Sequence, residues 1–70
     1  MTDFERTKQF LDSLGILYSC KNGNITFGKD SYGEEYDGYP SCDKVGGYYG
    51  FCTRFEFDEY GKFLIVGAWE

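Results

Sequence analysis

Residues 16–28, ILYSCKNGNITFG, contain the turn from which the fold of this chain can be worked out. Asn22 and Gly23 form a dipeptide typical of a two-residue type I′ turn, because both turn positions need a positive φ. This turn pairs Cys20 with Ile25 and gathers the apolar residues on one face of a hairpin. The alternation of apolar and polar residues predicts the same register as the turn. We therefore predict a hairpin over about residues 16–28, with Cys20 in the core.

The residues before this hairpin carry the signals of an amphipathic helix. Thr2 and Glu5 have the spacing of a capping box. Gly15 is a suitable C-terminal cap, since glycine adopts the left-handed conformation without strain. A helix over about residues 3–14 follows, and its apolar residues recur at helical spacing: Phe4, Phe10, Leu11 and Leu14.

A second hairpin is predicted over about residues 49–69. Residues 59–61, EYG, are suited to a three-residue loop with glycine in the left-handed position. Uninterrupted pairing then sets Phe57 against Phe63 and continues two residues at a time. The inner face becomes almost wholly aromatic and aliphatic. The outer face receives the apolar residues Cys52, Leu64, Val66 and Ala68.

The same register pairs Thr53 with Gly67, and both are small residues between large neighbours. We expect a shallow dent there, over which the helix docks closely. The fold class is therefore α+β: one N-terminal amphipathic helix on a four-stranded antiparallel sheet made of two hairpins. Residues 1–70 form a single domain, with a long loop rich in Tyr, Gly and acids over about residues 29–48.

The segment 29–50 is the unusual part of the sequence. It holds five of the chain's seven tyrosines and five of its 10 glycines, and its five acids outnumber its two lysines. Tyrosine combined with glycine and serine is typical of antibody paratopes, in which rigid rings sit on an adaptable backbone. We predict that this segment binds a protein partner through the following residues: Asp30, Tyr32, Glu34, Glu35, Tyr36, Asp37, Tyr39, Asp43 and Tyr48. The alternative is that the tyrosines fold back over the second face of the sheet.

No arrangement of residues indicates catalysis. The chain has no histidine, which is the commonest general base and metal ligand near neutral pH. The acids of residues 30–37 lack the ligand spacing of an EF-hand, and the glycines of VGGYYG lack the lysine of a P-loop. We expect no enzyme activity, no metal site and no cofactor.

The net charge of −5 disfavours direct binding to nucleic acid, where affinity depends on Lys and Arg. An acidic surface favours a partner with a basic surface. In size, charge and aromatic content the chain resembles the small acidic proteins with which phages and other mobile elements inhibit host factors. That resemblance implies an inhibitor that mimics nucleic acid and occludes a nucleic-acid-binding surface, for example an anti-CRISPR or other anti-defence protein. The alternatives are a small oligomeric scaffold or subunit, and a domain that sequesters a small molecule at a dimer seam.

The three cysteines, Cys20, Cys42 and Cys52, are an odd number without metal-binding spacing. We expect free thiols in a cytoplasm, that of the host cell if the protein is phage-encoded, with a Cys42–Cys52 disulfide as the alternative. Cys42 falls in the loop and is expected to tolerate serine. No secretory signal or membrane span is visible, and a monomer or a homodimer fits the sequence equally well.

Overall fold

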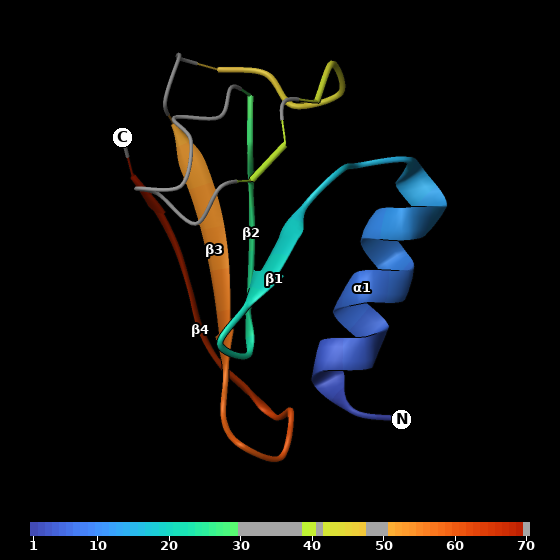
Figure 1. Cartoon of the computed structure of the whole chain (residues 1–70), viewed down its shortest axis with the longest axis vertical. Coiled ribbons are helices and arrows are strands. Elements are labelled where there is room, and N and C mark those ends of the chain that lie inside the picture. Colours follow the sequence, from blue (N-terminus) through green and yellow to red (C-terminus); the bar gives the residue numbers. More distant parts are fainter. Residues whose placement is uncertain (30–38, 41, 48–50, 70) are drawn as a thin grey trace.

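The computed structural model describes residues 1–29, 39–40, 42–47 and 51–69. One helix, α1 (Asp3–Leu14), precedes four strands. The strands are β1 (Ser19–Lys21), β2 (Asn24–Gly28), β3 (Cys52–Phe57) and β4 (Phe63–Trp69). They form one antiparallel sheet in the order β1-β2-β3-β4, with α1 packed against it (Figure 1). The α+β prediction, with an N-terminal helix and a four-stranded sheet, is confirmed.

Both ends of α1 are capped as the sequence predicts. The Thr2 side chain accepts the Glu5 N–H, and a Glu5 carboxylate oxygen accepts the Thr2 N–H at 3.2 Å, which completes the capping box. This bond to the Thr2 backbone holds the pKa of Glu5 below its ordinary value. Gly15 ends the helix in the left-handed conformation, with φ of 75°.

The core lies between α1 and the sheet. Leu11, Ile25 and Phe57 are buried together, and the Phe4 ring meets the Phe57 ring edge to face at 5.3 Å between centroids. Five partly buried residues surround this cluster: Phe4, Ile16, Tyr18, Phe27 and Phe55. Only part of the helical stripe docks, because Phe10 and Leu14 remain exposed.

The first hairpin has the predicted register. Cys20 pairs with Ile25, and Asn22 and Gly23 both adopt positive φ in the turn. The prediction that Cys20 lies in the core is wrong, because its side chain is exposed. It stands on the outermost strand, beside the polar residues Lys8 and Asp12 of α1 rather than the docked apolar ones.

The second hairpin has the predicted loop but not the predicted register beyond its first pair. Phe57 pairs with Phe63, and a register shift follows between Glu56 and Phe57, so that Glu56 pairs with Ile65. One residue of β4, Leu64, is therefore extra, as in a β-bulge. Because side chains alternate along a strand, one extra residue exchanges the two faces for the rest of β4.

The predicted Thr53–Gly67 pair consequently does not form. Thr53 pairs with Ala68, and Gly67 pairs with Arg54, on the other face of the sheet. Val66 lies opposite Phe55 and so shares the face that α1 covers. The helix packs over the cluster of Ile25 and Phe57, and the predicted dent and docking place are wrong.

Within the described residues, no helix combines the length and the apolar composition that a membrane crossing requires.

Candidate partner-binding site

Lys29 and Tyr39, the residues on either side of the acidic stretch 30–38 (the acidic segment), both lie at the end of β2. Tyr39, which follows the segment, is 1% exposed, and its ring lies against Gly28 at the end of β2. A Cβ atom on Gly28 would lie 2.6 Å from Cε2 of Tyr39 and 2.8 Å from the Phe51 carbonyl oxygen. Only glycine allows so close an approach. The ring therefore fixes the chain where the segment returns to the sheet.

Residues 42–45 are held against the end of α1. The Cys42 N–H donates to the Lys29 carbonyl at 3.4 Å, and the buried Cys42 thiol lies 3.9 Å from the Gly15 carbonyl oxygen as a weak donor. The Lys44 ammonium donates to the Leu14 carbonyl at 2.9 Å. The Lys44 ammonium complements the negative end of the helix dipole. No residue of α1 does so, because the last turn of the helix has no basic residue.

Both lysines of the 29–50 segment are thus engaged with the chain itself. Lys29 donates to the Gly47 carbonyl at 3.3 Å, and Lys44 bonds the last turn of α1. Asp43, between them, is exposed. Neither lysine is therefore available to approach a binding partner together with the acids of the 29–50 segment.

Over the whole chain, the positive charges and the excess negative charges also lie in different residue ranges. All seven Lys and Arg residues lie in the described ranges, together with seven of the 12 acids. The described residues are therefore balanced in formal charge. The net charge of −5 arises from the other five acids: Asp30, Glu34, Glu35, Asp37 and Glu70.

The structure describes two of the nine predicted contact residues. Asp43 is exposed, and Tyr39 is buried. The Tyr39 ring packs on Gly28, whose missing side chain would point to the face of the sheet opposite to that of Ile25. This is the face that the alternative prediction assigns to the tyrosines. The remaining seven lie outside the described residues: Asp30, Tyr32, Glu34, Glu35, Tyr36, Asp37 and Tyr48.

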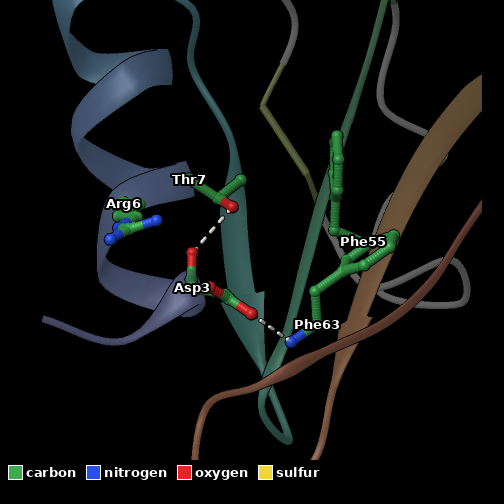
Figure 2. A pocket seen from close by; sticks show the side chains of 5 residues that line it. All are labelled: Asp3, Arg6, Thr7, Phe55 and Phe63. Carbon is green, nitrogen blue, oxygen red and sulfur yellow. Dashed lines mark hydrogen bonds between the residues drawn. The ribbon is translucent and has the colours of Figure 1, made fainter.

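A second feature is an apolar groove between α1 and the sheet, which no pattern in the sequence predicts. One hollow of about 420 Å³ is lined by Asp3, Arg6, Thr7, Phe55 and Phe63 (Figure 2). A further hollow of about 420 Å³ shares Arg6, Thr7 and Phe55 and continues toward Phe10 and Phe27. The two form one groove because α1 covers the sheet only in part.

Two polar side chains of this groove, Asp3 and Thr7, are bonded to the backbone. An Asp3 carboxylate oxygen accepts the Phe63 N–H at 2.9 Å, and the Thr7 hydroxyl donates to the Asp3 carbonyl at 2.9 Å (Figure 2). Arg6 supplies a cation to the lining of the same hollow. The groove can accept an apolar side chain. Among the described residues there is no group of His, Cys, Asp and Glu able to hold a metal ion.

The chain matches no family model, no curated protein and no solved structure.

Proposed function

We propose that this protein is a small non-enzymatic inhibitor that binds a basic surface of another protein through its acidic segment, residues 30–38. The surface is one that normally binds nucleic acid, as in a CRISPR effector, a restriction enzyme or a polymerase. The carboxylates take the place of phosphates. None of the three cysteines is in a disulfide, which fits a cytoplasmic setting.

The observation that carries this proposal is the fixed base of the segment. Lys29 precedes it and is bonded to Cys42, while Tyr39 follows it and is packed on Gly28. Residues 30–38, DSYGEEYDG, contain four acids, two tyrosines and no cation. A short acidic stretch tied at both ends loses less conformational entropy on binding than a free tail of the same composition.

Charge and rings have separate roles in such a contact. Exposed carboxylates mainly steer the encounter, and salt screens them over about 8 Å at physiological ionic strength. Tyrosine rings make the contacts that slow dissociation, since binding hot spots are enriched in tyrosine. Tyr32 and Tyr36 are the rings of residues 30–38 left for this role, because Tyr39 is buried in the fold.

The test is displacement of a labelled duplex from a panel of purified nucleic-acid-binding proteins, followed by fluorescence anisotropy. The wild-type chain is expected to release the duplex from its target. The variant Glu34→Gln, Glu35→Gln, Asp37→Asn raises the net charge by three and is expected to abolish release. Its matched control, Gln9→Lys with Glu59→Lys, raises the net charge by the same three units at exposed positions elsewhere and should still release it.

Equal loss of activity in both variants would show that only total charge matters. Equal activity in both would place the contact outside residues 30–38. In the complex, Tyr36→Ala should mainly raise the dissociation rate, whereas loss of carboxylates should lower the association rate and its salt dependence. Absence of displacement across the whole panel would count against a nucleic-acid-binding surface as the target.

A further inference from the structure

β4 is the last strand of the sheet, and its outer edge has no partner strand among the described residues. In Figure 1 this edge faces away from the other strands and from α1. Every second residue of an edge strand turns its N–H and C=O groups outward. Such an edge can accept a further strand, and natural proteins commonly protect it with charged residues, proline or a bulge.

Most of β4 lacks that protection. Its sequence, FLIVGAW, contains no charged residue and no proline. The exposed fractions of four consecutive side chains are 42% for Phe63, 59% for Leu64, 58% for Ile65 and 47% for Val66. Ile65 and Val66 point to opposite faces, so the strand is open on both faces as well as along its edge.

The beginning of β4 is different. The Phe63 N–H is already bonded to the Asp3 carboxylate at 2.9 Å, and the bulge at Leu64 interrupts the regular pairing. The bond takes up the Phe63 N–H, and the strand is irregular there, so a further strand cannot pair before Leu64. The accessible edge therefore runs from Leu64 to Ala68, with Val66 at its centre.

We propose that this edge pairs with the same edge of a second copy, antiparallel and centred on Val66, to join the two sheets into one. Antiparallel pairing of a strand with itself sets Val66 opposite Val66 and Leu64 opposite Ala68. This is the isologous contact of a two-fold dimer. Both copies contribute the same unsatisfied backbone groups, so the hydrogen bonds are reciprocal.

Charge favours a copy of this chain as the occupant. Four of the five unmatched acids belong to residues 30–38, whereas β4 itself carries no charge and the described residues are balanced. In sequence, Lys62 precedes the strand and Glu70 follows it. Antiparallel pairing about Val66 sets the end of each strand that Lys62 precedes beside the end of the other strand that Glu70 follows in sequence, whereas parallel pairing would bring ends of like charge together.

The first test is the mass in solution over a concentration series, by sedimentation equilibrium. The wild-type chain is expected to shift from monomer to dimer as its concentration rises. Val66→Lys should stay monomeric, because the two-fold axis would set two lysines directly opposite each other. Phe10→Lys is the control, since Phe10 is exposed on α1 at 61%, and it should dimerise as wild type does. Ala68→Lys serves if Val66→Lys does not fold, as judged by circular dichroism.

The second test is the register, by cysteine cross-linking in a Cys20→Ser background that removes the exposed thiol. Val66→Cys should form a disulfide-linked dimer on mild oxidation, since directly opposite Cβ atoms lie about 4.5–5.5 Å apart. Leu64→Cys alone should not form a disulfide-linked dimer, but a mixture of Leu64→Cys and Ala68→Cys chains should. A wild-type chain that is monomeric at every concentration, a Val66→Lys variant that still dimerises, or equal linking by Leu64→Cys alone would each overturn the proposal.

Discussion

The ring of Tyr39 occupies the space that a side chain on Gly28 would need, with Cε2 2.6 Å from the position of the missing Cβ. Gly28→Ala should therefore lower the free energy of unfolding by about 1–3 kcal/mol through overpacking. Gly46→Ala is the matched control, because nothing lies within 4 Å of its Cβ position, and it should leave stability within about 0.5 kcal/mol of wild type. Denaturant unfolding measures both variants. Equal stability of Gly28→Ala and Gly46→Ala would show that Tyr39 does not pack on Gly28.

The three cysteines should differ, according to their burial, in how much stability a serine costs and in how readily the thiol reacts. Cys42 and Cys52 are 5% and 4% exposed, whereas Cys20 is exposed. Cys42→Ser should cost about 1–3 kcal/mol of stability, because it places a hydroxyl where the site offers only one long contact, and Cys20→Ser should cost little. In the native chain one thiol of three should react with an aromatic disulfide reagent. Its reaction should be slow at neutral pH, since partial desolvation raises the pKa of Cys20. Rapid modification of Cys42 would contradict this assignment.

The raised pKa of Tyr18 predicts that the protein loses stability at alkaline pH. Burial, reinforced by the bond that its hydroxyl donates to Asp12 at 2.9 Å, raises the pKa of Tyr18 to about 12. In the unfolded chain the phenol ionises near its ordinary value of about 10. The folded state therefore binds more protons between these values, so this contribution to stability is present below about pH 10 and is lost as the pH rises toward about 12. Tyr18→Phe should flatten this alkaline decline in denaturation curves, and an unchanged decline would exclude Tyr18 as its source.

The bond between the Asp3 carboxylate and the Phe63 N–H leads to a prediction about stability and about the edge of β4. Asp3→Ala leaves the Phe63 N–H without its acceptor and should lower stability by about 1 kcal/mol. Asp3→Asn keeps an oxygen at the same place and should cost less. If the edge of β4 pairs with a second copy, Asp3→Ala should also strengthen dimerisation, because it frees the beginning of the strand. Sedimentation equilibrium measures this, and weaker dimerisation of the alanine variant would contradict it.

Local signals in the sequence predicted most of the fold. The Asn22–Gly23 turn predicts its own register, and the Thr2–Glu5 capping box and Gly15 define the two ends of α1. Each of these signals lies within a few residues of the structure that it determines. This is why the helix, the first hairpin and the α+β class followed from pattern alone.

The bulge and the packing of Tyr39 depend on contacts distant in sequence. Phe63 to Val66 is apolar at every position, so period-two alternation does not distinguish a regular strand from a bulged one. Gly28 lies at the end of a clear alternating pattern, and a glycine there is a signal of close approach by another part of the chain. That signal could have indicated a contact for Gly28, but not that Tyr39 makes it.

The extra residue in β4 also means that length, and not only composition, decides which side of this strand meets the helix. Deletion of Leu64 would remove the bulge and leave Ile65 opposite Glu56 and Val66 opposite Phe55, so the later side chains would keep their faces. Loss of one residue after Val66 would instead shift the side chains beyond it by one place and turn them to the other face of the sheet. Tolerance to changes in length should therefore be least in the regular part of β4 after Val66 and greater at the bulge and in the turn at Glu59 and Tyr60.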